Sequence, residues 1–252
     1  MTFISDTYYM FLRWMKKLVR NPILLFFSLF QPIIFLLLFT QLFSSFGVLL
    51  GVNYTLFATA GIVLQNAFSS AFQSGTAIVD DIKSGFLAKI LATPASRASI
   101  LLGRLLSDAF RVFAQSLIIL VLAYGLGVFP ATGILGYILI LVTVAFFGLA
   151  WSGISLALGL RTKSAETVFG IAGTLTFPLL FMSTALMKPE LMPEWMQNVS
   201  AYNPISFAVN AIRDLIMTGY VWNSFSQAYG VISLIAVLTL GATLYEFRKV
   251  VS

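Results

Sequence analysis

The feature that most constrains this chain is the length of its segments without a charged residue. Four such runs occur, at 21–79, 112–160, 167–187 and 215–245. A helix that crosses the hydrocarbon core of a bilayer needs about 20 mainly apolar residues. The first two runs are each long enough for two helices and a turn, and the last two fit one helix each. The sequence therefore predicts six spans.

Turn-forming residues divide the two long runs. Gly47, Gly51 and Asn53 interrupt the first run, and 129–133 (Phe-Pro-Ala-Thr-Gly) interrupts the second, as expected for short connections between antiparallel helices. The predicted spans are 23–46, 54–76, 100–127, 134–160, 165–187 and 225–246.

Composition agrees with a membrane protein. Only 10% of the 252 residues are charged, whereas soluble domains carry roughly 25%. The predicted fold class is all-α integral membrane, with 1–252 as a single transmembrane domain. The chain has no Cys and no His, which excludes a thiolate nucleophile, a Ser-His-Asp triad, a His-based proton relay and the usual zinc sites. We predict no catalytic residue, metal site or cofactor in this chain.

The distribution of basic residues predicts the orientation. With both termini in the cytoplasm, all of the 15 Lys and Arg residues except Lys188 and Arg213 lie on the cytoplasmic side. This arrangement follows the positive-inside rule. We therefore expect a multi-pass protein of the cell membrane (plasma or inner), in contact with lipid. The excess of basic residues is explained by this membrane orientation, so nucleic acid is not an expected partner.

Residues 1–21 form the first predicted element outside the spans, an amphipathic interfacial helix. Phe3, Phe11 and Trp14 fall on one face and Arg13 and Lys16 on the opposite face. Such a helix lies along the cytoplasmic membrane surface. Two interpretations stay open: an anchor that only contacts lipid, or a helix that also contacts a cytoplasmic partner.

The second element is the cytoplasmic loop 80–99. Phe86, Leu87, Ile90 and Leu91 share one face of a short helix that Pro94 terminates. We expect these four side chains to find little of their own protein to pack against. The helix then lies on the bilayer or docks on another subunit.

The third element is the external segment 188–224. Asn203 and Pro204 are typical of a helix N-cap and first helical residue. An apolar stripe that includes Ile205 and Ile212 follows, opposite Arg213 and its polar neighbours. The segment is either a helix dipping into the outer leaflet between the fifth and sixth spans or an amphipathic cap on the external surface.

Ionisable groups are placed near the ends of the spans. Ion-coupled transporters usually keep a carboxylate near the middle of the membrane, and none of the six predicted spans has one there. Energy for any transport should therefore come from elsewhere. Arg104, Asp108 and Arg111 share a helical face, so the carboxylate can pair with both guanidinium groups. We interpret them mainly as a structural ion pair, with a relay of motion from the loop as the alternative.

Uncharged polar residues recur in two spans. Gln65, Asn66, Ser69 and Gln73 lie in the second span, and Thr174 and Thr176 lie in the fifth. Such groups commonly hydrogen-bond across helix interfaces, and they could instead line a path for an amphipathic solute.

A phosphate-binding loop is absent from the sequence. The pattern G-x-x-x-x-G-K-[ST] requires a Gly before its Lys. Lys83 follows Ile82 and Lys163 follows Thr162, so we do not expect this chain to hydrolyse ATP.

Three groups of motifs occur in order along nearly the whole chain. They are Arg20-Asn21-Pro22 with Gln31-Pro32, the loop from Asp81 to Arg97 with Gly85, Leu91, Thr93-Pro94 and Ser96-Arg97, and Pro193-x-Trp195-x-Gln197 followed by Asn203-Pro204 and Ala211-Ile212-Arg213. Together they resemble the membrane subunit of type-2 ABC exporters, most closely the daunorubicin-exporter-like permeases. Two positions depart from that pattern: Ala60-Gly61 stands where relatives often have Pro-Gly, and the loop starts with fewer acidic residues.

The resemblance implies a six-span permease with an N-terminal interface helix, a coupling helix between spans two and three, and re-entrant helices before span six. It also implies two cytoplasmic ATPase subunits, which would hold ATP and Mg, and a second permease copy or a homologue. The ATPase would contact Gly85, Phe86, Leu87, Ile90, Leu91, Thr93, Pro94 and Arg97. The substrate path would include Gln65, Asn66, Ser69, Gln73, Thr174 and Thr176, and the external helix carries Asn203, Pro204 and Arg213.

The function expected from these features is export of a hydrophobic or amphipathic substrate, such as a drug, lipid or glycan-like molecule, powered by a separate ATPase. Two alternatives remain at this point: an ion-coupled secondary carrier, and a membrane scaffold that transports nothing.

Overall fold

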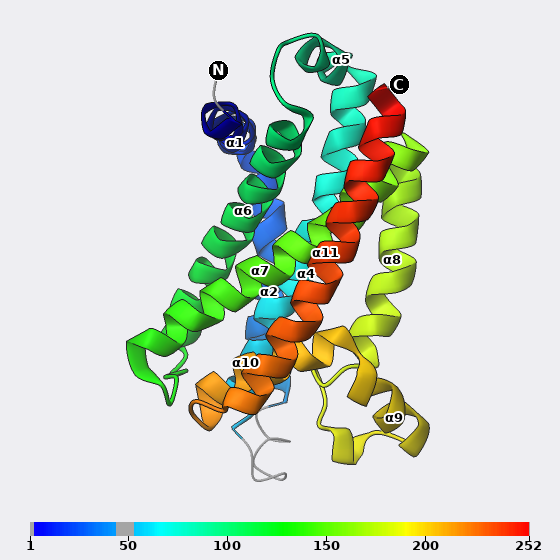
Figure 1. Cartoon of the computed structure of the whole chain (residues 1–252). Coiled ribbons are helices and arrows are strands. Elements are labelled where there is room, and N and C mark those ends of the chain that lie inside the picture. Colours follow the sequence, from blue (N-terminus) through cyan, green and yellow to red (C-terminus); the bar gives the residue numbers. More distant parts are fainter. Residues whose placement is uncertain (1–2, 44–52, 252) are drawn as a thin grey trace.

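A computed structural model describes residues 3–43 and 53–251, and these residues are organised as a bundle of helices (Figure 1). The helices are α1 (Phe3–Val19), α2 (Pro22–Leu42), α4 (Tyr54–Lys83), α5 (Phe86–Leu91), α6 (Arg97–Gly125), α7 (Gly133–Thr162), α8 (Ala165–Phe181), the 3-10 turn η1 (Pro189–Leu191), α9 (Glu194–Tyr202), α10 (Pro204–Met217) and α11 (Trp222–Val251). The all-helical fold class is confirmed for this part of the chain. The turn predicted at Gly47 and Gly51, and the last residues of the first predicted span, lie outside the described residues.

Four of the described helices are long and apolar enough to cross a membrane. They contain the segments Leu25–Leu42, Arg97–Gly125, Gly133–Thr162 and Trp222–Lys249. The two other predicted spans correspond to α4, which is 30 residues long but more polar, and to α8, which has 17 residues. α8 ends at Phe181, six residues before the predicted end at 187, because the chain turns there toward α9 and α10.

The helix α4 begins and ends at residues suited to those positions. The Asn53 side chain accepts hydrogen bonds from the backbone N–H groups of Thr55 (3.1 Å) and Leu56 (3.4 Å), as an N-cap residue does. At the other end Gly85 has φ 69°, a conformation that Gly adopts without steric cost. α4 continues to Lys83, beyond the predicted end at 76, so the first residues of the predicted loop 80–99 are helical.

The helix α4 is the centre of the bundle. It packs against α2, α6, α7, α8 and α10, while α7 also packs against α11, and α1 lies across α6. The short helix α5 and both ends of the chain lie at one end of the bundle, and α9 lies at the other (Figure 1). We refer to these as the α5 end and the α9 end.

Small residues let α4 and α7 approach closely. A Cβ atom on Gly75 would lie 2.2 Å from the carbonyl oxygen of Ser155, and one on Gly159 would lie 2.4 Å from the carbonyl oxygen of Gly75. The Ser155 hydroxyl accepts a hydrogen bond from the Gly75 N–H (2.8 Å) and donates one to the carbonyl of Phe72 (2.8 Å). Small residues and a bridging hydroxyl are the usual means of joining helices in a membrane.

Candidate functional site

The helix α5 is held against the rest of the chain by two of its apolar side chains. Leu87 and Ile90 are buried, at 4% and 8% exposure. They belong to one apolar cluster that also contains Ile78 of α4, Leu101 of α6 and Phe247 of α11. Phe86 and Leu91 are half-buried and pack against the same cluster, so the expectation that these four side chains find little of their own protein to pack against is wrong. The predicted helix is present, but its apolar face points inward.

The opposite side of α5 and the turn that follows it face outward. Ala88, Lys89, Thr93, Pro94 and Arg97 are exposed, whereas the remaining predicted contact residues, Gly85, Phe86 and Leu91, are half-buried. The Thr93 hydroxyl donates to the carbonyl of Ile90 (2.6 Å), which closes the end of the helix. A small surface that carries two basic residues, Lys89 and Arg97, thus protrudes at the α5 end of the bundle.

Two basic residues of α1 bind the end of α4. The Arg13 guanidinium donates to both carboxylate oxygens of Asp81 (3.0 and 3.3 Å), and the Lys17 ammonium donates to Asp81 Oδ1 (3.2 Å). Arg13 also lies 3.4 Å above the ring of Phe86, the first residue of α5. The basic face of α1 is therefore an internal contact as well as a polar face. Sequence reasoning missed this pairing, although Arg13 and Lys17 are one turn apart and suited to sharing one carboxylate.

A buried ionic network connects α6 to α4. Asp108 lies between Arg104 (Nε to Oδ2, 3.1 Å) and Arg111 (Nη2 to Oδ1, 3.2 Å), and the three residues are 3–6% exposed. The Ser74 hydroxyl of α4 donates to the same carboxylate and accepts from Arg104 Nε (3.1 Å). Within the described residues, no group of three or more acidic side chains is placed to hold a metal ion.

The network extends from the α1 surface to the middle of α4. On one side, the Arg104 guanidinium lies 3.7 Å from the centre of the Trp14 ring. On the other, Arg111 donates to the carbonyl of Ser70 (2.5 Å) and to Oε1 of Gln73 (3.4 Å). Contacts therefore run without interruption from α1 to the polar residues of α4.

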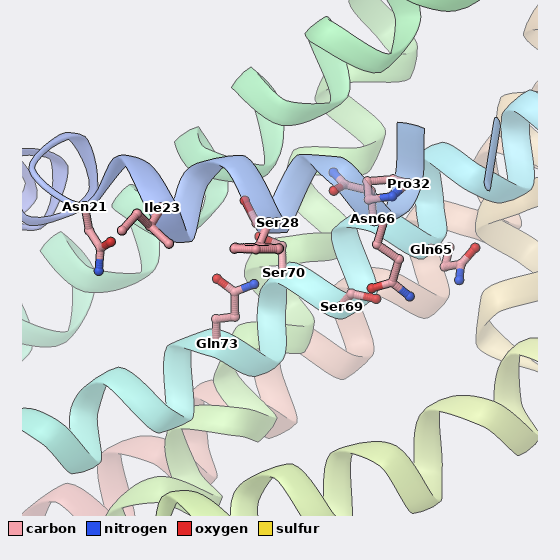
Figure 2. Close-up of a pocket in the computed structure, with 11 residues that line it drawn as sticks. Asn21, Ile23, Ser28, Pro32, Gln65, Asn66, Ser69, Ser70 and Gln73 are labelled. Atoms are coloured by element: carbon pink, nitrogen blue, oxygen red, sulfur yellow. The ribbon is translucent and has the colours of Figure 1, made fainter. Parts of the chain in front are cut away.

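Those polar residues line a cavity of about 360 Å³ between α2 and α4 (Figure 2). Four predicted path residues, Gln65, Asn66, Ser69 and Gln73, contribute to it. The cavity also has lining residues that the prediction did not include, namely Asn21, Ile23, Phe27, Ser28, Gln31, Pro32 and Ser70. The polar lining carries amide and hydroxyl groups and no charge.

Part of the cavity wall is fixed by hydrogen bonds to α6. The Ser70 hydroxyl donates to Gln115 Oε1 (2.9 Å), whose amide donates to the Ser28 hydroxyl (2.8 Å). Asn66 Nδ2 lies at the hydrogen-bond limit of 3.5 Å from Ser116 Oγ. Gln65, another lining residue, has a buried Oε1 atom without a hydrogen-bond partner.

The two predicted path residues of α8 lie apart from this cavity. The hydroxyls of Thr174 and Thr176 each donate to a carbonyl of their own helix, at Gly170 (2.8 Å) and Ala172 (2.5 Å). Phe169, Phe177 and Phe181 are exposed along α8, at 58–61%. The helix therefore presents a largely aromatic surface that the chain itself does not cover.

At the α9 end, Asn203 joins three segments. Its side-chain oxygen accepts from the Ile205 N–H (2.9 Å), and its amide donates to the carbonyls of Leu179 (2.7 Å) and Met182 (2.9 Å) at the end of α8. Pro204 occupies the first helical position of α10. The predicted N-cap is thus formed, and the same side chain also stabilises the C-terminus of α8.

The apolar stripe predicted for this helix is buried. Ile205, Val209, Ile212 and Ile216 are each at most 2% exposed, and α10 packs against α4 and α11. Arg213 was expected on the polar face. It donates to Asn210 Oδ1 of the same face (3.2 Å) and to the carbonyl of Thr184 (2.6 Å), and it lies 3.8 Å from the Phe57 ring.

The position where relatives often have Pro-Gly is continuous helix in this chain. α4 runs without interruption through Ala60 and Gly61. A Cβ on Gly61 would lie 2.2 Å from the carbonyl oxygen of Ala185, so Gly61 allows the turn after α8 to approach the backbone of α4.

Comparison with known proteins places this arrangement in a family. The profile of the ABC-2 type transporter family matches residues 6–217. A daunorubicin resistance ABC transporter permease protein from Streptomyces coeruleorubidus is 30% identical over 243 residues, covering 95% of this chain and 86% of the relative. A putative transport permease from Cyanophora paradoxa is 32% identical (84% and 74% covered), and a probable doxorubicin resistance ABC transporter permease protein from Mycobacterium tuberculosis is 23% identical (87% and 79% covered). The chain therefore belongs to the ABC-2 type transporter family, as a membrane permease subunit and not itself an enzyme.

Proposed function

We propose that this permease is the membrane subunit of an ATP-driven exporter that moves a hydrophobic or amphipathic substrate out of the cytoplasm. Two copies of a separate ATPase subunit supply the energy and hold ATP and Mg. A second permease copy or a homologue completes the assembly. The relatives named for daunorubicin and doxorubicin resistance support an amphipathic drug or a similar molecule as substrate.

Six spans are part of this proposal, with α4 and α8 added to the four apolar helices. At 30 residues, α4 is about 45 Å long, which exceeds the hydrocarbon thickness of about 30 Å. Five neighbouring helices shield its polar side chains from lipid. α8, with 17 residues, is at the lower limit of a span. Both termini and α5 then lie in the cytoplasm, together with nearly all the basic residues.

The observation that carries the proposal is the construction of α5. A protruding helix is useful for transmitting force only if it is rigidly joined to the spans. Leu87 and Ile90 join it to the apolar cluster, and Arg13 joins its first residue to Asp81. The small exposed surface around Ala88 is left available for an ATPase subunit, so that a displacement of α5 displaces α4 and α1 together.

The polar cavity supports the α4 part of the proposed substrate path. Its uncharged amide and hydroxyl groups suit an amphipathic molecule with neutral hydrogen-bonding groups. Thr174 and Thr176 belong to the path only if the second permease brings another surface against α8.

An ion-coupled carrier is less well supported. Such a carrier needs a carboxylate that is free to bind and release its ion. Asp108 is the buried carboxylate of α6, and it is paired with two guanidinium groups and the Ser74 hydroxyl. A scaffold that transports nothing would not need the polar cavity.

The test is co-purification of the ATPase with the tagged permease in a mild detergent. We expect two ATPase subunits and two permease subunits in the wild-type complex, the second permease being another copy of this chain or a homologue. Ala88→Glu places a charge in the exposed α5 surface and should reduce recovery of the ATPase at least tenfold, because an unpaired charge in an interface is costly. Ala201→Glu, at an exposed alanine of α9, is the matched control and should have no effect.

Two outcomes would contradict the proposal. One is full ATPase recovery with Ala88→Glu, which removes α5 as the docking element. The other is a wild-type permease that purifies without any ATPase while remaining folded.

A further inference from the structure

Two carboxylates at the cytoplasmic side of the bundle are each shared by two cations. Asp81 accepts from Arg13 and Lys17, and Asp108 pairs with Arg104 and Arg111. Both carboxylates are nearly buried, with side chains 4–5% exposed. Each cluster therefore keeps one positive charge in excess. In the Asp108 cluster the excess charge is buried, because the side chains of Arg104 and Arg111 are only 5% and 7% exposed, and a buried charge is costly unless a counter-ion is close to it. In the Asp81 cluster the Lys17 side chain is 46% exposed.

The two clusters border one cavity of about 270 Å³, formed by α1, α4, α6 and the start of α8. Lys17, Arg104 and Arg111 line it, together with the carboxylates of Asp80 and Asp108. The charges of these five residues sum to one positive charge. Arg111, which is 6% exposed, also has an Nε atom without a hydrogen-bond partner. The net positive charge and the unpartnered Nε atom both favour binding of an anion in this cavity.

The surroundings of this cationic cavity suit a molecule that is only partly polar. Met15, Leu18 and Phe169 contribute apolar surface to its lining, beside Trp14. Asn21 and Gln73 line both this cavity and the uncharged cavity between α2 and α4, so the two adjoin. Trp14 and Asn21 lie where the chain enters its first apolar helix, which is the level of lipid headgroups.

We propose that the cationic cavity binds the anionic headgroup of an amphiphile from the cytoplasmic leaflet, with the rest of the molecule directed toward the α2–α4 cavity. A singly charged phosphodiester matches the excess charge, and guanidinium groups are well suited to phosphate oxygens. This inference uses the proposed orientation of the chain but does not depend on transport or on the ATPase.

The test compares two lipids that share a phosphodiester and differ in net charge. The full-length permease is placed in nanodiscs of equal parts phosphatidylglycerol and phosphatidylcholine, and the lipids retained on release are counted by native mass spectrometry. We expect the wild-type chain to retain phosphatidylglycerol preferentially. Lys17→Gln should reduce that preference about fivefold, the effect of one basic residue near an anionic surface.

A second variant predicts the opposite change. Asp80 is an exposed carboxylate of the cavity lining, so Asp80→Asn should increase the preference by a similar factor. Arg161→Gln is the matched control, because Arg161 is exposed at the same end of the bundle and does not line the cavity. It should change the preference less than twofold, because Arg161 lies outside the cavity and salt screens its charge from a headgroup bound there. Arg111→Gln should abolish the preference if the variant folds.

Three results would overturn the inference: no preference in the wild-type chain, an equal loss with Lys17→Gln and Arg161→Gln, or displacement of phosphatidylglycerol by millimolar inorganic phosphate. The last would indicate a site for free phosphate. The ATPase pull-down on the same variants separates the two proposals, because a lipid preference that persists without ATPase binding contradicts only the exporter.

Discussion

The helix α4 meets α7 and α2 in two different ways. Against α7, Gly75 and Gly159 bring the backbones so close that a single methyl group would overlap the neighbouring carbonyl, and Ser155 bridges the two helices. Against α2, the same helix presents amides and hydroxyls to a cavity of about 360 Å³. Small residues let α4 and α7 pack closely, whereas a cavity with a partly polar lining lies between α4 and α2.

The difference assigns separate roles to the two sides of α4. A closely packed interface with no spare volume transmits displacement because it cannot deform. An interface with a cavity can change its separation and can admit another molecule. We therefore expect α4 and α7 to move together during transport, while α2 and α4 change their distance. The following predictions test this contrast, from the largest effect to the smallest.

Gly75→Ala should break the close interface. The added Cβ would lie 2.2 Å from the Ser155 carbonyl oxygen, so the helices must separate, and we expect a loss of about 3 kcal/mol in the free energy of unfolding. Denaturant titration in mixed micelles measures it. Gly230→Ala in α11 is the matched control, because its Cβ meets nothing within 4 Å. Equal stability of the two variants would contradict the close approach of α4 and α7.

Ser69→Leu, at the α2–α4 interface, should reduce export while leaving stability nearly unchanged, whereas Gly75→Ala mainly reduces stability. The substitution makes the cavity wall apolar, so stability should change by less than about 1 kcal/mol, while export of an amphipathic substrate should fall about tenfold through the loss of one hydrogen-bonding group. ATP-dependent uptake into inverted vesicles measures the rate. Export at the wild-type rate would remove the α2–α4 cavity from the path.

Ser155→Ala should give the smallest effect. It removes both bridging hydrogen bonds between α4 and α7 while keeping their close approach, and interhelical hydrogen bonds in membranes contribute about 1 kcal/mol. The same titration should show a loss of that size, with an unchanged export rate in the folded fraction. A loss of export without a loss of stability would place Ser155 in the transport path.

The sequence predicts that these helices exist and where two of them begin, but it does not predict where α8 ends. Uncharged runs and turn residues placed α6 and α7 within three residues of their observed starts. The end of α8 could not be predicted from the local sequence. The helix ends where the carbonyls of Leu179 and Met182 accept hydrogen bonds from Asn203, which follows more than twenty residues later. Local patterns predict where a helix begins more reliably than where a tertiary contact terminates it.

The candidate site shows the same limit. The spacing of Leu87 and Ile90 predicted a helix with an apolar face, yet it could not indicate that this face joins an apolar cluster that includes Phe247, near the other end of the chain. Spacing placed Asp108 within reach of both arginines, since all three lie on one helix. The pairing of Arg13 with Asp81 joins two helices, and neither helix contains a signal that specifies the other.

The docking of an ATPase on α5 is the central claim, and single-cysteine cross-linking tests it most directly. The chain contains no cysteine, so one introduced thiol reports one position. We predict that Ala88→Cys, treated with a short heterobifunctional maleimide reagent, forms a covalent adduct with the ATPase subunit, and that Ala201→Cys does not. An adduct at Ala201→Cys, or none at Ala88→Cys in a complex that still contains the ATPase, would contradict the account.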